Sequence, residues 1–355
     1  MTMIDAMSVS PFAAIGRGTL ETAGIVAGAV VAGLAAFVVA LPWIVQPFLR
    51  LVLAVRYDIR RVGLENVPES GPVLVASNHL SWFDGLFLAA ALPRRGTALM
   101  NAAAFRLPVV GFLARRCGLI PLPYSGPRAQ RAAIEACRQA LREGRALGIF
   151  PEGQLSRNGM TAGFHRGLEV ILSGLDDAPA VPVFLDGVWG SVASFYDGRF
   201  WKRWPRGWRR TIVVSFGPPV EPPVTAFKAR QAVLVAGVAA RSSFRKPPGP
   251  LKTIDPALPH LDHPTLGPLA ASSANYQDSE VKETGQKEGS VGLPIPGVAL
   301  RAVDDAGAAL PADAEGRLQA LAAGHPGWVD LDRRGRIDRD GFVFLVPDQT
   351  KPTAG

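Results

Sequence analysis

The stretch that decides the fold is residues 73–84, VLVASNHLSWFD. Its first four residues are apolar and predict a short buried strand, and the polar residues that follow predict the strand's end at the rim of a sheet. A helix that begins near Ser81 would bring Asp84 round one turn later, where it can face His79. A carboxylate bonded to one imidazole nitrogen fixes the tautomer and leaves the other nitrogen as a base. The stretch therefore predicts a group that can take a proton from an alcohol, with a structural histidine as the alternative.

Further candidate strands and helices alternate along the chain on both sides of this stretch. The apolar patterns predict strands near residues 59–62, 98–101, 118–122, 146–150, 180–185 and 211–216, and helices over residues 85–92, 102–115, 127–144 and 166–175. Alternating elements of this length are typical of an α/β fold.

An uncharged segment near the N-terminus, residues 23–45, is long enough to cross a bilayer as a helix. The alternatives are a signal peptide, whose apolar region would be shorter and preceded by its positive charges, and a buried helix of a soluble protein. Arg17 is the one basic residue before the segment, and four arginines follow it closely: Arg50, Arg56, Arg60 and Arg61. The positive-inside rule therefore places the body of the protein on the cytoplasmic side of the membrane.

The charge balance favours anionic partners, because the formal net charge of the 355 residues is +8. Cys117 and Cys137 are the two cysteines, so a disulfide framework is not expected and a reducing compartment fits. Residues 199–210, RFWKRWPRGWRR, interleave tryptophan with arginine. Such a segment can stack on nucleic-acid bases, lie among lipid headgroups, or form a solvated hairpin. Next to a membrane segment we favour the lipid interpretation over nucleic acid.

Composition also suggests where the chain divides. We expect an N-terminal tail (1–22), a membrane-spanning or membrane-docked helical segment (23–58), a catalytic domain (59–245), a proline-rich linker (246–266) and a small β-rich C-terminal piece (267–355).

A second polar stretch, residues 150–157 (FPEGQLSR), follows another predicted strand. Its glutamate stands in a rigid turn between proline and glycine, a position suited to holding a polar ligand, although a purely structural turn is the alternative. Asn78-His79 with Asp84, followed about seventy residues later by Phe150-Pro151-Glu152-Gly153, resembles the glycerolipid acyltransferases of the lysophosphatidic acid acyltransferase type. The resemblance covers residues 62–219 and includes Val181-Pro182-Val183 as that family's fourth block.

The resemblance implies a central mixed sheet flanked by helices and transfer of a fatty acyl group from acyl-CoA or acyl-ACP to the free hydroxyl of a lysophospholipid. His79 would be the general base and Asp84 would orient it, whereas Glu152 and Gly153 would help hold the glycerol moiety. The remaining residues expected to bind substrate are Asn78, Ser81, Ser156 and Arg157. The family implies a membrane as partner, no nucleic acid, and no metal or bound cofactor.

Two departures from the family pattern bear on the acceptor. Gln154 and Leu155 stand where the family commonly has threonine and arginine, and Leu122-Pro123 stands where it has an arginine. Those arginines would bind a free phosphate by charge-assisted hydrogen bonds. We therefore expect an acceptor like lysophosphatidylethanolamine, with phosphatidic acid synthesis and a non-catalytic lipid-binding protein as alternatives. Arg115, Arg128 and Arg157 are possible substitutes for the missing arginines.

The C-terminal piece resembles parts of AMP-forming acyl-activating enzymes in residues 275–278, 289–297 and 335–342. Bacterial fusions of an acyltransferase with an acyl-ACP synthetase join two such units in this order. The piece has under a hundred residues and lacks a nucleotide-binding loop with a following lysine, so we expect a remnant that does not activate fatty acids. His165 lies shortly after the second polar stretch, and we expect it to make a loop hydrogen bond.

Overall fold

The computed structural model describes residues 17–123, 125–196, 209–248, 251, 254–277 and 282–347. The chain divides into two compact units, Met1–Val45 and Gln46–Gly355. Most of the tryptophan and arginine segment, residues 199–208, lies outside the described residues, so its interpretation stays a prediction. Of the expected N-terminal tail, residues 1–16 lie outside them as well, and residues 17–22 are helical.

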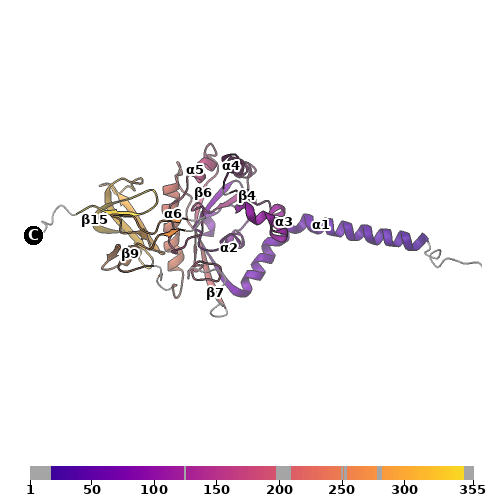
Figure 1. Cartoon of the computed structure of the whole chain (residues 1–355), viewed down its shortest axis with the longest axis horizontal. Coiled ribbons are helices and arrows are strands. Elements are labelled where there is room, and N and C mark those ends of the chain that lie inside the picture. The colour runs from indigo at the N-terminus through magenta and orange to yellow at the C-terminus, as the bar shows by residue number, and fades with distance from the viewer. Residues whose placement is uncertain are drawn as a thin grey trace, which may run out of the picture. The chain divides into compact units, whose positions relative to one another are not determined.

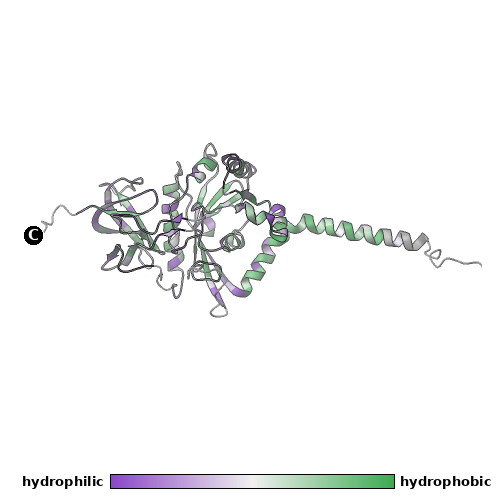
Figure 2. Ribbon diagram, viewed as in Figure 1, coloured by the Kyte–Doolittle hydropathy of each residue, from purple (hydrophilic) through white to green (hydrophobic). Residues whose placement is uncertain are grey.

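Helix α1 spans Arg17–Arg56 and extends at both ends beyond the predicted uncharged segment. Its part Ile25–Arg56 is long and apolar enough to cross a membrane, by length and composition alone. Figure 2 shows this helix coloured as hydrophobic over most of its length. A helix with exposed apolar side chains, such as Ile25, Leu34 and Phe37, is consistent with the predicted membrane segment.

The second unit is built on a seven-stranded sheet with the strand order β1-β7-β6-β2-β5-β3-β4. The strands are β1 (Tyr57–Val62), β2 (Val73–Ser77), β3 (Gly96–Asn101), β4 (Ile120–Leu122), β5 (Ala146–Ile149), β6 (Ala180–Asp186) and β7 (Arg210–Phe216). Strands β6, β2, β5, β3 and β4 are parallel, whereas β7 is antiparallel to β6 and carries β1 parallel to itself. The expected central mixed sheet is confirmed.

Helices cover both faces of this sheet (Figure 1). The helices are α2 (Asp84–Ala91), α3 (Pro108–Arg116), α4 (Pro127–Arg142), α5 (Gly167–Leu172) and α6 (Ala226–Ser242), with short 3-10 helices η1 (Leu64–Asn66) and η2 (Ala102–Arg106). Buried side chains of α4, α5 and α6 form one apolar core with Leu74 and Ala76 of β2. Buried side chains of α2 and the end of α1 form another core with Val73 and Val75.

Strand β2 lies at the centre of the architecture, and all five of its residues are buried. A parallel strand that is covered on both faces needs apolar side chains on both, which explains the continuous apolar run. Because β2 and β5 are parallel neighbours, their carboxyl ends meet at one edge of the sheet. Residues 78–84 and 150–157 therefore leave the sheet side by side, where an open α/β sheet commonly binds its ligand.

Two helical regions differ from the sequence-based expectation. The helix expected over residues 102–115 divides at Leu107, because Pro108 starts α3 at a position where its missing N–H is tolerated. Helix α6 was not predicted. Thr225 caps its N-terminus by accepting a hydrogen bond from the Lys228 N–H at 3.2 Å. Helix α6 packs against β6 and β7 on one side and against β13 on the other. Because it is buried on both sides, it lacks the polar face by which a surface helix is recognised in a sequence.

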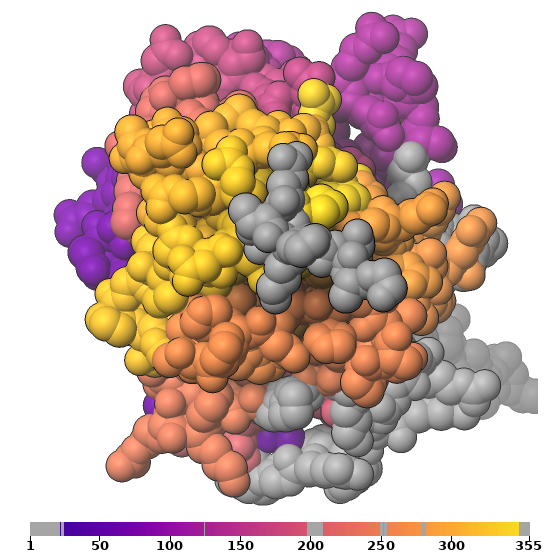
Figure 3. Space-filling view, turned by 90° about the vertical axis from the view of Figure 1, so that its left-hand side faces the viewer, coloured from indigo at the N-terminus to yellow at the C-terminus, as the bar shows by residue number. Residues whose placement is uncertain are grey.

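The C-terminal residues are β-rich, as expected. Three small sheets contain β8 (His260–His263), β9 (Gly267–Ala271), β10 (Tyr276–Gln277), β11 (Lys282–Glu283), β12 (Leu293–Pro294), β13 (Val298–Val303), β14 (Gly316–Ala322), β15 (Val329–Ile337) and β16 (Val343–Leu345). Strand β8 lies within the range expected to be a linker, and its residues form a strand because they pair antiparallel with β9. Figure 3 shows residues of this C-terminal piece, in orange and yellow, grouped on one face of the molecule.

Candidate active site

The histidine and aspartate of the first polar stretch lie in direct contact. Nδ1 of His79 is 3.0 Å from Oδ2 of Asp84. The aspartate side chain is fully buried, whereas the histidine side chain is 22% exposed. With its proton on Nδ1, the imidazole donates to Asp84 and keeps the lone pair on Nε2 for an incoming ligand.

The turn between β2 and α2 holds the Asp84 carboxylate in this position. Oδ2 accepts hydrogen bonds from the Leu80 and Ser81 backbone N–H groups, and Oδ1 accepts from Ser81 Oγ at 2.6 Å. The expectation of a helix that begins near Ser81 was wrong, because α2 begins at Asp84 itself. The carboxylate reaches back to His79 across a tight turn and not across a helical turn.

An aromatic neighbour also holds the His79 imidazole, and the second polar stretch fixes its backbone. The ring of Phe150, at the end of β5, stacks on His79 with the centroids 4.1 Å apart and the planes inclined by 17°. The backbone of His79 is also fixed, because its N–H donates to Oε1 of Glu152 at 2.8 Å and its carbonyl accepts from Ser156 N–H at 2.9 Å. The two polar stretches are thus joined at His79.

Glu152 is buried in this junction, and only 3% of its surface is exposed. Its Oε2 accepts a hydrogen bond from Ala162 N–H at 3.0 Å. Burial raises the pKa of Glu152 to about 8 and outweighs the two N–H donors and the charge of Arg230, which lower it. The structure thus gives this glutamate the role of fixing the His79 backbone.

Arg230 of α6 is a charged group of this region that sequence reasoning missed. It is fully buried, and it donates to the carbonyls of Ala162 at 2.9 Å and Thr161 at 2.8 Å. Burial lowers the pKa of its guanidinium to about 10, against the charges of Glu152, Asp338 and Asp340. Gly341 lies against it, because a Cβ at position 341 would stand 2.1 Å from Arg230 Cζ. No sequence signal singled it out, because Lys228 and Gln231 stand close to it in the chain.

The C-terminal strands contact the loop that follows Glu152. Glu283 of β11 accepts hydrogen bonds from Arg157 N–H at 2.6 Å, from Ser156 Oγ at 3.4 Å and from the Asn158 backbone N–H. Gln154 Nε2 donates to the Lys282 carbonyl at 3.2 Å. Burial raises the pKa of the Glu283 carboxyl. The C-terminal piece therefore braces the loop 154–158, a role that its sequence did not suggest.

The other residues expected to bind substrate are found in different settings. Asn78 is buried, and its amide exchanges hydrogen bonds of 2.8 and 3.2 Å with the backbone of Leu185, which ties β2 to β6. Ser81 binds Asp84, and Ser156 Oγ binds Asn158 and the Met160 carbonyl. Each of these side chains is hydrogen-bonded within the protein and helps to position the loops of the site.

Gly153 is exposed, whereas Arg157 is partly buried. Gly153 has φ +69°, and a Cβ there would stand 2.8 Å from the ring of His165. His165 is exposed, and its backbone N–H donates to the Pro151 carbonyl at 2.8 Å, a hydrogen bond within the loop. The guanidinium of Arg157 lies 3.4 Å from the ring centroid of Phe195 and 4.7 Å from that of Tyr276. Cation–π contacts hold this arginine near the loop.

In the described part of the chain, no three histidine, cysteine, aspartate or glutamate side chains are grouped as metal ligands. The expectation of a site without metal or bound cofactor stays a prediction. The arrangement can accept a proton, because it places an oriented and partly exposed imidazole at the edge of the sheet.

Comparison with known proteins agrees with the two motifs. Residues 58–186 match the model of the family described as Acyltransferase. A 1-acyl-sn-glycerol-3-phosphate acyltransferase of Arabidopsis thaliana is 30% identical over 132 residues, 37% of this chain and 36% of that protein. A 1-acyl-sn-glycerol-3-phosphate acyltransferase of Borreliella burgdorferi is 31% identical over 105 residues, 30% of this chain and 42% of that protein. The chain thus spans well under half the length of these relatives.

Among solved structures, the 1-acyl-sn-glycerophosphate acyltransferase PlsC of Thermotoga maritima is 22% identical, covers 53% of this chain and 73% of that chain, and gives a TM-score of 0.44. The family-matched segment begins in β1 and ends with β6, and it contains both His79 with Asp84 and Glu152. The match to the acyltransferase family model is thus confined to residues 58–186, the segment that carries the candidate site.

Proposed function

We propose that this protein is a membrane-associated O-acyltransferase that transfers a fatty acyl group from a thioester to the free hydroxyl of a lysoglycerophospholipid. The observation that carries the proposal is the 3.0 Å contact between His79 Nδ1 and Asp84 Oδ2, with the imidazole partly exposed at the sheet edge. The match of residues 58–186 to the acyltransferase family supports it.

The chemistry follows from the tautomer that Asp84 favours. Nε2 of His79 takes the proton of the acceptor hydroxyl as its oxygen attacks the thioester carbonyl carbon. The carbon–sulfur bond then breaks, and the imidazolium returns its proton to the thiolate. The products are the acylated lipid and the free thiol of coenzyme A or acyl carrier protein. Asp84 remains ionised and stabilises the imidazolium between the two proton transfers.

The surface beside His79 suits a lipid substrate. Trp82 and Leu86, which flank Asp84 in the sequence, are 54% and 42% exposed. Large exposed apolar side chains next to a polar site provide a surface for an acyl chain. A membrane location, with the site on the cytoplasmic side, is supported by the apolar helix α1 and by the arginines that follow its uncharged part.

For the acceptor we consider two lysophospholipids. The names of the relatives favour 1-acylglycerol 3-phosphate. Gln154 and Leu155, in place of the expected threonine and arginine, favour an acceptor such as lysophosphatidylethanolamine, whose headgroup has no free phosphate. Arg157 is the cation of this loop that a phosphate can approach, although its two aromatic neighbours restrict it.

The proposal is tested by acyl transfer from acyl-CoA and acyl-ACP to each acceptor, with detergent-solubilised protein and its His79→Ala variant. We expect transfer to at least one lysophospholipid that depends on His79. Transfer to neither acceptor, with both lipids still bound by the protein, would favour a lipid-binding protein without catalysis. If Arg157 binds the phosphate, Arg157→Gln lowers transfer to 1-acylglycerol 3-phosphate more than transfer to lysophosphatidylethanolamine.

A further inference from the structure

Residues 85–134 form a cationic stretch of the chain between the two polar stretches of the candidate site. They contain seven arginines and no aspartate or glutamate. Helix α3 lies in the middle of this stretch, and its sequence PVVGFLARR ends in two of these arginines. A stretch with this charge favours a partner that has a negative surface.

Helix α3 is packed on one side. Of its nine residues, all of them described, Gly111 and Ala114 are buried. Gly111 faces η2 closely, because a Cβ at this position would stand 2.1 Å from the Phe105 carbonyl oxygen. Arg115 donates from Nη1 to the same carbonyl at 3.1 Å. The 3-10 helix η2 thus fixes the side of α3 that carries Gly111.

The other side of α3 combines apolar side chains with a cation. Val109, Phe112 and Arg116 follow one another at three and four residues, so they lie along one face of the helix, which we call the outer face of α3. At about 3.6 residues per turn, this face is opposite the one that carries Gly111 and Ala114. Val109 is 70% exposed and Phe112 is 43% exposed. The outer face is therefore an apolar surface with an arginine at its C-terminal end.

Helix α3 begins at the edge of the sheet that carries His79. Strand β3 is the parallel neighbour of β5, which in turn is the parallel neighbour of β2. The carboxyl ends of these three strands therefore lie at one edge, and η2 follows β3 directly. The start of α3, which comes after η2, is thus on the side of the sheet from which a substrate approaches His79.

We propose that the outer face of α3 docks on the surface of an anionic membrane, next to the edge of the sheet that carries His79. Val109 and Phe112 enter the boundary between headgroups and acyl chains, and Arg116 binds lipid phosphate. The inference rests on the membrane association in the proposed function, but it does not require acyl transfer. An acidic carrier protein is the other partner that arginines suit, and the apolar part of α1, long enough to cross a bilayer, favours the membrane.

The test measures contact between α3 and lipid in the full chain, reconstituted in nanodiscs. A bimane label is attached at Phe112→Cys or, in a second preparation, at Glu288→Cys, an exposed position of the C-terminal piece. Cys117→Ser removes the partly exposed native thiol, and Cys137 stays because it is buried. In nanodiscs of equal parts phosphatidylcholine and phosphatidylglycerol, spin-labelled lipid should quench the label at position 112 and not the label at position 288. Equal quenching at the two positions would overturn the membrane contact. Acyl transfer is measured separately, so this failure would not bear on the proposed catalysis.

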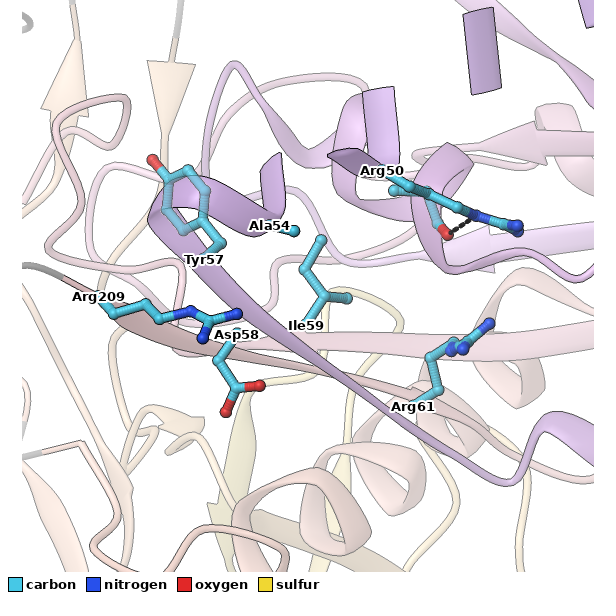
Figure 4. Close-up of a pocket in the computed structure, with 8 residues that line it drawn as sticks. Arg50, Ala54, Tyr57, Asp58, Ile59, Arg61 and Arg209 are labelled. Atoms are coloured by element: carbon cyan, nitrogen blue, oxygen red, sulfur yellow. Dashed lines mark hydrogen bonds between the residues drawn. The ribbon is translucent and has the colours of Figure 1, made fainter. Parts of the chain in front are cut away.

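Charge variants test the preference for anionic lipid. Arg115→Gln with Arg116→Gln should abolish the additional quenching at position 112 that phosphatidylglycerol gives over phosphatidylcholine alone. The matched control is Arg61→Gln with Arg209→Gln, which removes the same charge from a polar cavity between α1 and β1 (Figure 4). Strand β1 and strand β4, which follows α3, stand at opposite ends of the sheet, so the control should keep the full quenching. Equal losses in the two double variants, with unchanged melting temperatures, would refute a specific role of α3.

An acidic carrier protein as the partner would give a different pattern. Lipid would then quench the label at position 112 no more than the label at position 288. The double variant of Arg115 and Arg116 would instead weaken the binding of acyl-ACP, measured by surface plasmon resonance. That result would overturn the proposal and assign the outer face of α3 to the carrier protein.

Discussion

Replacing Glu283 by alanine tests whether the C-terminal strands support the candidate active site. The carboxylate accepts the N–H groups of Arg157 and Asn158 and the hydroxyl of Ser156. Alanine leaves two backbone donors without their acceptor in a place where Glu283 itself is only 4% exposed. A buried donor without a partner costs about 1–3 kcal/mol, so for the two donors we expect a loss of about 2–6 kcal/mol in the free energy of unfolding.

The assay has two parts. The melting temperature should fall by about 4 °C or more, and acyl transfer at a temperature where the variant is folded should fall by about tenfold or more, because the loop next to Glu152 is no longer fixed. The matched control is Glu288→Ala, which removes an exposed carboxylate five residues away. If Glu283→Ala behaves as Glu288→Ala does in both measurements, the C-terminal strands do not support the site.

Three further predictions concern single contacts of the site. Glu152→Gln tests the raised pKa of Glu152, because the unfolded carboxyl loses its proton near pH 4.5 and the folded one near pH 8. The stability of the wild type relative to this variant should therefore fall as pH rises from 5 to 8. A difference in melting temperature that stays constant over this range would contradict the prediction. Gly341→Ala should destabilise the fold by about 2 kcal/mol more than Gly324→Ala in urea titrations. Both glycines have positive φ, but only position 341 has Arg230 within 4 Å. Equal losses of stability in the two variants would exclude the contact. Asp84→Asn should lower kcat by about 10²- to 10⁴-fold with the fold retained by circular dichroism, and a kcat near that of the wild type would remove Asp84 from the mechanism.

The sequence predicted the central architecture because its signals there are local. Residues 73–76 are apolar on both faces of a central strand, and the polar residues after them mark the sheet edge. Residues 78–84 and 150–157 meet because two parallel strands end at the same edge, a pairing that the sequence analysis did not derive. The contact between His79 and Asp84 was also expected, although the tight turn that makes it was not.

What the sequence did not reveal depends on packing between distant segments. Helix α6 is buried against strands on both sides, so it lacks the polar face by which a surface helix is recognised. Glu283 reaches Arg157 across 126 positions of the chain, and no local pattern reports such a pair. The same holds for Arg230, whose neighbour Gly341 lies in the turn between β15 and β16.

The central claim is that His79 takes the proton of a lipid hydroxyl, and replacing it by alanine tests this most directly. The measurement is the rate of a single turnover from labelled acyl-CoA to the lysophospholipid that the wild type prefers, with Arg131→Gln as a surface control. We predict a fall of at least about 10²-fold for His79→Ala with the melting temperature retained. A single-turnover rate within a factor of a few of the wild type would contradict the account, whatever acceptor is used.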